Sequence, residues 1–139
     1  MCRHETQKNA HGKVKYMNGV NKRKLKFRSD GTFRILQLTD LHIRPWNSLQ
    51  DPALDLMQRL VEWEKPDLIA FTGDVCCDGT LENTVEVWNT IADILAPYRV
   101  PFTVTYGNHE SDGDSGRQHV LAEALMQMPM AVFEKGAPE

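Results

Sequence analysis

From Leu25 onward, short apolar runs alternate along the chain with apolar residues at helical spacing. The first pattern is a pair of alternating segments, Leu25–Arg28 and Thr32–Leu38, separated by a turn-forming stretch that contains Asp30 and Gly31. An Asp-Gly pair between such segments supplies the positive φ angles that a tight turn needs. We therefore predict an N-terminal hairpin whose second strand ends near Thr39.

Three later segments have the spacing of amphipathic helices. The first begins at Asp51 and Pro52, residues suited to a helix cap and a first turn, and extends to about Lys65. The second ends at Pro97, and the third follows a loop rich in Gly, Asp and Ser. Their apolar positions are Ala53, Leu56, Met57, Leu60 and Val61, then Leu81, Val85, Trp88, Ile91, Ala92 and Leu95, then Leu121, Ala124, Leu125 and Met128.

Two segments between the helices have the length and composition of strands: the apolar run Leu68–Phe71, and Phe102–Tyr106, which is rich in β-branched and aromatic residues. The first is apolar throughout, which is typical of a strand covered on both faces. The order β, β, α, β, α, β, α predicts an α/β fold with mainly parallel strands and flanking helices. The carboxyl ends of parallel strands share one sheet edge, which is where ligands bind in such folds.

Length and composition describe one globular domain of 139 residues, with 41% hydrophobic and 25% charged residues. These values exclude collagen-like, low-complexity and wholly disordered chains. The chain has no run of eighteen apolar residues, and its first ten residues are polar. We therefore expect neither a membrane span nor a signal peptide, and a cytoplasmic location. The three cysteines, Cys2, Cys76 and Cys77, form no disulfide framework, and the last two are interpreted as small packing residues.

Charge is distributed unevenly along the chain. Residues 1–28 contain nine Lys or Arg and one acidic residue, Glu5, whereas residues 29–139 contain seven basic and eighteen acidic residues. A basic segment of this kind is able to contact nucleic acid or an anionic surface. Because no nucleic-acid motif or aromatic interleaving accompanies it, we favour a solvated leader and do not expect nucleic acid as a partner.

Metal-competent polar residues follow each of the three parallel strands. Asp40 and His42 follow the first strand, Asp74 the second, and Asn108 and His109 the third. The intervals from Asp40 to Asp74 and from Asp74 to Asn108 are both 34 residues, as expected of two successive β-α-β units. We therefore expect these side chains to converge at one edge of the sheet.

Carboxylates, imidazole and an amide oxygen that converge in this way favour a divalent cation among them. Such a ligand set suits Mn, Fe or Zn and is too poor in thiolate for a structural zinc site. Two ions roughly 3 to 4 Å apart are the usual arrangement for phosphate hydrolysis, and Asp74 on the middle segment is best placed to bridge them. The alternative is that Asp40, Asp74 and Asn108 only cap loops, since Asp and Asn are common in turns.

Three short motifs occur in order at these strand ends. They are Asp-Leu-His at Asp40–His42, Gly-Asp at Gly73–Asp74, and Gly-Asn-His-Glu at Gly107–Glu110. In this order they resemble the motifs of the calcineurin-like metallophosphoesterases. The approach to the first motif through Phe33–Leu38 is similar to the purple-acid-phosphatase-like branch of that family, and the resemblance covers roughly residues 24 to 130.

The resemblance implies a metal-dependent phosphoesterase that hydrolyses a phosphomonoester or phosphodiester with a water activated by two metal ions. It implies that His109 is not a ligand but reaches the phosphate, where it donates a proton to the leaving oxygen or stabilises charge. Glu110 would orient His109 or a neighbour. The implied metal ligands are Asp40 and His42 for the first ion, Asp74 as the bridge, and Asn108 for the second ion.

The sequence also departs from the family's pattern. Cys77 stands three residues after Asp74, where true purple acid phosphatases have a tyrosine, and their first motif lacks a counterpart of His42. The family completes its site with an isolated His motif and a Gly-His-x-His motif, and neither occurs here; His119, the only histidine beyond His109, is interpreted as an ordinary helix residue. The resemblance thus predicts the N-terminal half of an α/β/β/α sandwich, with one sheet face left bare. We expect a basic leader at residues 1–23 and a partial metallophosphoesterase domain at 24–139, truncated or completed by another chain.

Two functional hypotheses therefore stay open. The chain is a dinuclear phosphoesterase, or the N-terminal half of one, acting on a phosphate ester. Alternatively, it is a non-catalytic metal- or phosphate-binding half-domain that needs a missing C-terminal part. A response regulator with Asp40 as phosphoacceptor fits the α/β order but explains neither His42 nor the motif Gly107–Glu110.

Overall fold

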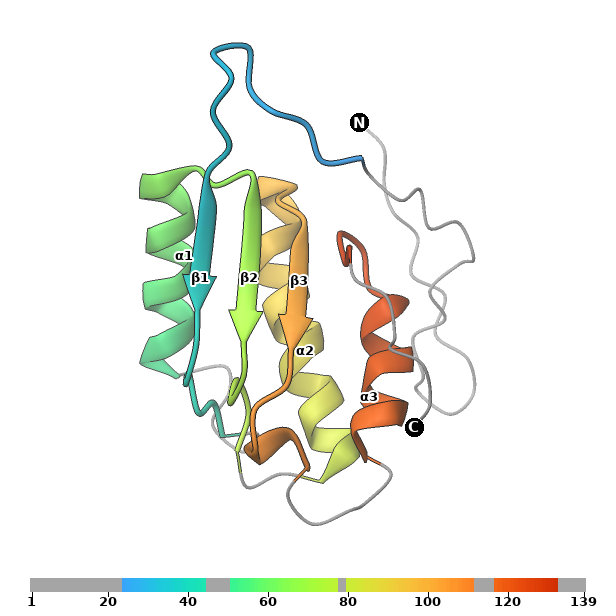
Figure 1. The fold of residues 1–139 in the computed structure, drawn as a ribbon. Coiled ribbons are helices and arrows are strands. Elements are labelled where there is room, and N and C mark those ends of the chain that lie inside the picture. Colours follow the sequence, from blue (N-terminus) through green and yellow to red (C-terminus); the bar gives the residue numbers. More distant parts are fainter. Residues whose placement is uncertain (1–23, 45–50, 78–79, 112–116, 133–139) are drawn as a thin grey trace, which may run out of the picture.

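Three parallel strands form the sheet of this protein. The computed structural model describes residues 24–44, 51–77, 80–111 and 117–132, so that the basic leader at 1–23 lies outside it. Strands β1 (Ile35–Leu38), β2 (Leu68–Thr72) and β3 (Phe102–Thr105) lie side by side in the order of the sequence (Figure 1). Both strand pairs are parallel, which confirms the α/β fold class and brings the three carboxyl ends to one edge.

Helix α1 (Pro52–Glu64) begins and ends where the sequence predicts. The Asp51 side chain accepts a hydrogen bond from the Ala53 N–H at 2.9 Å, and the left-handed Lys65 ends the helix. The predicted apolar face is wrong in one position, because Leu56 is 53% exposed. The helix packs through Leu54, Met57 and Val61, and Leu56 lies about 200° around the helix from Leu54.

Helix α2 (Leu81–Leu95) supplies the centre of the core. Its N-terminus is capped by Thr80, and a short 3₁₀ turn, η2 (Ala96–Tyr98), follows its last residue, so that the helix ends two residues before the predicted end at Pro97. The Trp88 ring packs edge-on against Phe71, with centroids 5.1 Å apart, and stacks on Phe102 at 6.1 Å. The buried residues of this helix are Thr84, Val87, Trp88, Ile91, Ala92 and Leu95.

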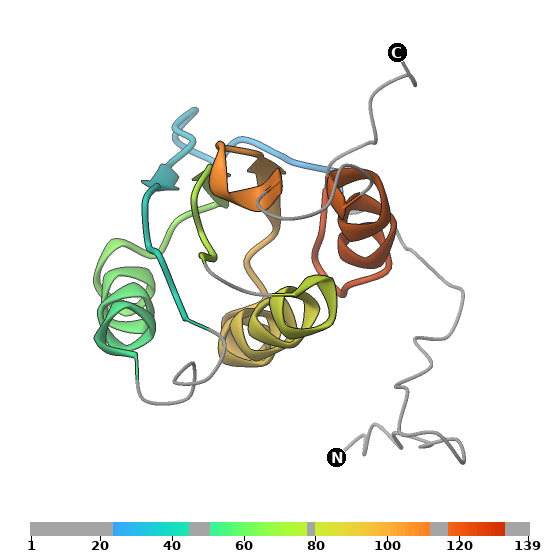
Figure 2. The same cartoon turned by 90° about the horizontal axis from the view of Figure 1, so that it is seen from below.

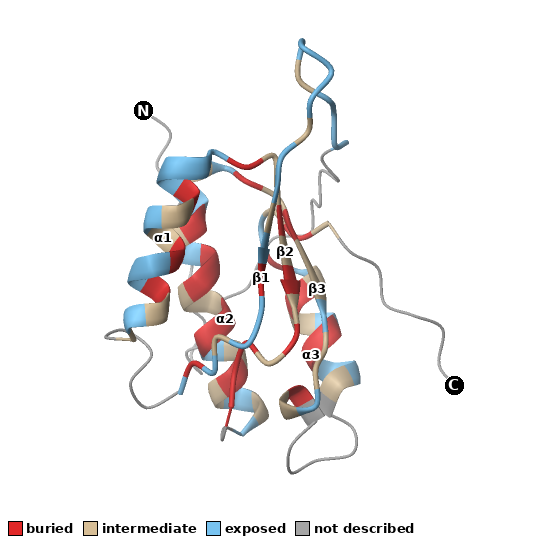
Figure 3. Cartoon of the chain, turned by 60° about the vertical axis from the view of Figure 1, so that its left-hand side comes forward, coloured by how far each residue is buried: buried red, intermediate tan, exposed pale blue. Residues whose placement is uncertain are grey.

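The helices cover one face of the sheet. Helices α1 and α2 pack on the same face, and α3 (Arg117–Met126) lies beyond β3 (Figures 1 and 2). Two successive right-handed crossovers that step across the sheet in one direction place both helices on the same side. Figure 3 shows their buried residues turned toward the strands and their exposed residues turned outward. In the described ranges no helix is long and apolar enough to cross a membrane.

The other face of the sheet has no covering helix or strand among the described residues. Along β2, Ile69 and Phe71 are fully buried, whereas Leu68, Ala70 and Thr72 are only partly buried. The cover on both faces that the apolar run Leu68–Phe71 predicts is therefore not present in the described part of the chain. This agrees with the expectation of a single sheet with one bare face.

The N-terminal hairpin is present only as its turn. The Arg28 N–H donates a hydrogen bond to the Thr32 carbonyl across the turn at 2.9 Å, and Gly31 has the positive φ of 81° that the turn requires. Within residues 24–34 there is no strand, and β1 begins at Ile35. Leu25 and Phe27 are 45% and 74% exposed, so the first arm buries too little apolar surface to hold a two-stranded ladder.

Asp67 ties this turn to the start of the sheet. Its carboxylate accepts hydrogen bonds from the Arg28 Nε at 2.8 and 3.1 Å and from the Arg34 backbone N–H at 2.8 Å. These contacts, the Arg34 bond first, lower the pKa of Asp67 below 3.8. The Asp67 carboxylate thus holds the segment before β1 to the start of β2.

Because its pKa is lower in the folded chain than in the unfolded chain, Asp67 contributes stability above about pH 3.8 that is lost as the pH falls through its folded pKa. We expect Asp67→Asn to reduce the loss of stability on acidification. The measurement is the urea midpoint from neutral to acidic pH, with Asp93→Asn at an exposed position of α2 as the control. If the urea midpoint of Asp67→Asn falls with pH as steeply as that of the unmodified chain, Asp67 does not contribute this stability.

Candidate metal centre

The backbone takes an unusual conformation where β1 and β2 end. Asp40, His42 and Asp74 have positive φ angles of 53°, 47° and 53°, which is uncommon for residues other than glycine. Hydrogen bonds fix the two exits against each other, since the Asp40 N–H donates to the Gly73 carbonyl and the His42 N–H to the Asp74 carbonyl, both at 3.0 Å. Outliers of this kind cluster at functional sites, where the surrounding structure holds them in place.

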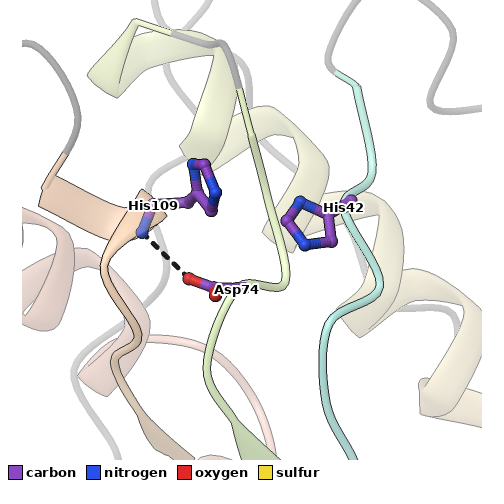
Figure 4. A group of neighbouring side chains, drawn as sticks. All are labelled: His42, Asp74 and His109. Atoms are coloured by element: carbon purple, nitrogen blue, oxygen red, sulfur yellow. Dashed lines mark hydrogen bonds between the residues drawn. The ribbon is translucent and has the colours of Figure 1, made fainter.

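Three of the predicted side chains meet at this edge. One donor atom each from His42, Asp74 and His109 lies within 4.8 Å of the other two, and the two imidazole centroids are 5.0 Å apart. Figure 4 shows the two rings next to each other, above the Asp74 carboxylate. The His109 backbone N–H donates to Asp74 Oδ1 at 2.9 Å, so the third loop is tied directly to the second.

Asp40 and Asn108, the remaining predicted ligands, lie on the loops at the same edge. Asp40 is exposed, with its Oδ1 3.8 Å from His42 Nε2, and its Oδ2 accepts a hydrogen bond from the Thr39 hydroxyl at 2.7 Å. Asn108 is exposed on the loop between Gly107 and His109. The roles of Asp40 and Asn108 as metal ligands stay predictions. His119 is an exposed residue of α3 whose Nε2 lies 3.7 Å from Glu123 Oε1.

Glu110 fixes the loops that carry the site. Its side chain is 1% exposed and accepts three backbone hydrogen bonds: from Asp74 at 3.0 Å, Val75 at 2.8 Å and Gly107 at 2.7 Å. The family resemblance implies that Glu110 orients His109 or a neighbour, and the structure shows contact with the backbone of the Asp74 and Gly107 loops. The buried Glu110 carboxylate therefore holds the loops that follow β2 and β3 in fixed positions relative to each other.

Gly73 and Gly107 allow these two loops to approach each other closely. A Cβ on Gly107 would lie 2.3 Å from Asp74 Oδ1, and a Cβ on Gly73 would lie 2.8 Å from the Gly107 nitrogen. Gly73 also has a φ of 109°, which side chains rarely adopt. The absence of a side chain at Gly107 is thus a requirement for the position of the Asp74 carboxylate.

Two residues near the site, Cys77 and Tyr106, have surroundings that sequence reasoning missed. Cys77 is buried, and its thiol donates to the His42 carbonyl at 3.3 Å, so it supports the backbone of a predicted ligand. Burial, with a smaller contribution from the Glu110 charge, raises the pKa of Tyr106 to about 12. The buried Tyr106 hydroxyl has no hydrogen-bond partner among the described residues. A thiol and a phenol at these positions carry no sequence signal that separates them from ordinary core residues.

The donor set fits a divalent transition-metal ion. Two imidazoles and a carboxylate are ligands that Zn, Fe and Mn accept, and the partly exposed His42 leaves the edge open to solvent. Asp40 and Asp74 place two carboxylates at this edge, and a bound cation would offset their charge. The geometry therefore supports metal binding, and it leaves the number and identity of the ions open.

Comparison with known proteins identifies the family. The sequence pattern of the calcineurin-like phosphoesterases matches residues 33–134. The chain is 30% identical, over 70% of its length, to probable inactive purple acid phosphatase 28 of Arabidopsis thaliana, and 28% identical, over 86%, to probable inactive purple acid phosphatase 29 of the same plant. It is also 28% identical, over 76% of its length, to phosphatase DCR2 of Saccharomyces cerevisiae.

The chain spans only a part of each of these relatives. The matched segment covers 28% and 34% of the two plant proteins and 20% of the yeast protein. The family pattern nevertheless extends over all three parallel strands and all three motifs at their ends. On the fold, the strand-end motifs and this match, the chain belongs to the calcineurin-like phosphoesterase family.

Proposed function

We propose that this chain carries the N-terminal half of the active site of a metal-dependent phosphoesterase that hydrolyses a phosphomonoester or phosphodiester. The observation that supports this most directly is the convergence of His42, Asp74 and His109 at the carboxyl edge of the sheet. Residues from three separate strand exits meet there, and this arrangement is difficult to explain by loop capping alone. The substrate class is inferred from the chemistry of the family to which the chain belongs.

The ligands proposed for two metal ions are Asp40, His42, Asp74 and Asn108. Ions of the Mn, Fe or Zn type held by these residues would supply Lewis acidity and lower the pKa of water. Asp74 is best placed to serve both ions, because its carboxylate lies between the first and third strand exits (Figure 4). Glu110 contributes by holding the Asp74 and Gly107 loops so that little reorganisation is needed when substrate binds.

His109 is proposed to act on the phosphate ester itself. A protonated imidazole at this position stabilises negative charge on the phosphoryl oxygens and donates a proton to the leaving oxygen. Its backbone N–H donates to Asp74 Oδ1, so the main chain of this residue is held beside the carboxylate. Further ligands and substrate contacts are proposed to come from residues beyond this sequence or from a second chain, because the Gly-His-x-His motif of the family does not occur here.

A second candidate is a non-catalytic metal- or phosphate-binding half-domain. Two of the relatives carry the word inactive in their names, although the yeast relative is named a phosphatase. A half-domain of this kind would keep the metal-binding edge and the Glu110 contacts but would hydrolyse no ester. Both candidates therefore predict metal binding, but only the phosphoesterase predicts turnover.

The experiment is to add Mn to the purified chain and follow release of nitrophenol from mono- and bis-nitrophenyl phosphate. We expect slow turnover that chelation abolishes and that Asp74→Asn lowers at least about a hundredfold, because the substitution removes the charge of a central ligand and keeps its shape. His119→Ala on α3 is the matched control and should retain the rate. Turnover that survives Asp74→Asn contradicts the proposal, and metal binding without turnover favours the second candidate.

A further inference from the structure

Residues 24–35, here named the basic–aromatic turn, expose apolar side chains between basic ones. The sequence alternates the two kinds of residue on both arms of the turn. The apolar residues Leu25, Phe27 and Ile35 are 45%, 74% and 57% exposed. Figure 3 shows the segment largely in the colour of exposed residues, above the strands. The basic residues that alternate with the apolar ones are Lys24, Lys26, Arg28 and Arg34.

Two contacts fix the apolar side chains of the turn at the surface. The rings of Phe27 and Phe33 meet edge to face, with centroids 5.8 Å apart, so that the two arms present their aromatic side chains at one place. The Asp67 carboxylate, which accepts a hydrogen bond from Arg28, holds the turn to the start of β2. The apolar residues of the turn do not belong to the hydrophobic core. Apolar groups that cluster at a surface within a polar surround mark an interaction site.

Charge is sorted between this turn and the helices. Asp30 is the only acidic residue of the turn. Helix α2 contains no lysine or arginine, and α1 contains only Arg59. The exposed acidic residues of the two helices are Asp55, Glu62, Glu64, Glu82, Glu86 and Asp93. An anionic surface therefore attracts the turn and repels the helical layer, so that it selects one orientation of the chain.

We propose that the basic–aromatic turn binds this chain to the surface of an anionic lipid bilayer. Phe27 and its apolar neighbours enter the boundary between headgroups and acyl chains, and the lysines attract anionic headgroups. Figure 1 shows the turn beyond the amino ends of the strands, at the end of the sheet opposite to the candidate metal centre. A bilayer at the turn thus leaves the carboxyl edge facing the solution, and its binding does not depend on the proposed phosphoesterase activity.

A bilayer matches both kinds of side chain, whereas other occupants match one. Nucleic acid offers phosphates to the lysines and base faces to Phe27, but no hydrocarbon to the aliphatic Leu25 and Ile35. A second copy of the turn offers apolar contact, but it brings like charges together. In a bilayer, hydrocarbon lies directly beneath a charged surface, so the apolar and the basic residues are accommodated at the same time.

The test is sedimentation of the full chain with vesicles of phosphatidylcholine, alone or mixed with phosphatidylserine. Each Lys or Arg close to an anionic surface raises the affinity about fivefold, so we expect at least about tenfold tighter binding to the mixed vesicles. Added salt should weaken this binding. Phe27→Ser should lower the affinity at least about fivefold, and the double variant Lys24→Gln/Lys26→Gln at least about tenfold.

Matched control variants lie on α1. Leu56→Ser replaces an apolar side chain that is 53% exposed, and Arg59→Gln removes an exposed cation. Both should bind the mixed vesicles within about twofold of the unmodified chain, because they lie outside the turn. Far-ultraviolet circular dichroism checks that every variant is folded.

Four results would overturn the proposal. Equal affinity for neutral and anionic vesicles would exclude the role of the basic residues. Binding that persists in both the Phe27 and the lysine variants would assign the attraction to residues 1–23. A loss confined to the lysine variant would mean adsorption by charge without entry of the apolar side chains. Self-association that Phe27→Ser abolishes in the absence of lipid would assign the turn to a second copy of the chain.

Discussion

Glu110→Gln is expected to lower the free energy of unfolding by about 2 to 4 kcal/mol, since hydrogen bonds to a charged group contribute about 1.5 to 3 kcal/mol each and an unpaired buried donor adds to the loss. The carboxylate accepts three backbone N–H groups and is 1% exposed. A glutamine has one amide oxygen in place of two acceptors, so at least one backbone N–H would face an NH₂ group. A change of this size is a large fraction of the stability of a typical domain.

The measurement is urea unfolding followed by circular dichroism. Glu86→Gln makes the same chemical change at an exposed position of α2 and should alter stability by less than about 0.5 kcal/mol. Zinc affinity should fall in Glu110→Gln as well, because the Asp74 and Gly107 loops lose their common anchor. Equal stability of the two variants would show that the Glu110 hydrogen bonds do not hold these loops.

Gly107→Ala is expected to have an effect of similar size through steric overlap. The added Cβ would lie 2.3 Å from Asp74 Oδ1, 2.7 Å from its Cγ and 2.9 Å from its backbone nitrogen. Such distances are too short for any Cβ, so either the Asp74 carboxylate or the third loop has to move. We expect a loss of about 3 kcal/mol or more in stability, at the upper end for overpacking, together with loss of metal binding.

Gly31→Ala provides the comparison for this substitution. Gly31, unlike Gly107, has a positive φ of 81°, and a Cβ placed there has no neighbour within 4 Å. We expect it to lose only about 1 kcal/mol from backbone strain, with metal binding retained. If Gly107→Ala binds zinc as tightly as Gly31→Ala, the close packing of the two loops is not needed to position Asp74.

Most of the fold could be predicted because its elements carry strong local signals. Asp51 and Pro52 mark the start of α1, and Leu81–Leu95 repeats apolar residues with the period of a helix. The equal spacing of Asp40, Asp74 and Asn108 indicates repeated β-α-β units and therefore the shared edge. Where errors occur, they concern burial: Leu54 and Leu56 are equally apolar, and only the packing partner decides which of them faces the sheet.

The sequence predicts which strand-end residues share one edge of the sheet, but not the contacts among them. The motifs indicate which residues gather at the edge, and the structure brings His42, Asp74 and His109 together. The three backbone bonds of Glu110 and the thiol contact of Cys77 depend on how loops from different strands approach, which no local pattern encodes. The N-terminal hairpin shows the opposite case. Its turn is encoded locally at Asp30–Gly31 and is present in the structure. Strand pairing also needs buried apolar side chains, and Leu25 and Phe27 are exposed.

The left-handed backbone at Asp40, His42 and Asp74 has a consequence for attempts to make this chain more heat-resistant. Each such residue costs about 1 kcal/mol or more, so that roughly 3 kcal/mol is held in the segments that present the donor groups. Selection for thermal tolerance alone would therefore favour glycine at these three positions. The same substitutions would remove every donor that the loops after β1 and β2 contribute to the edge. Heat-resistant variants should therefore be tested for zinc affinity in each round of selection.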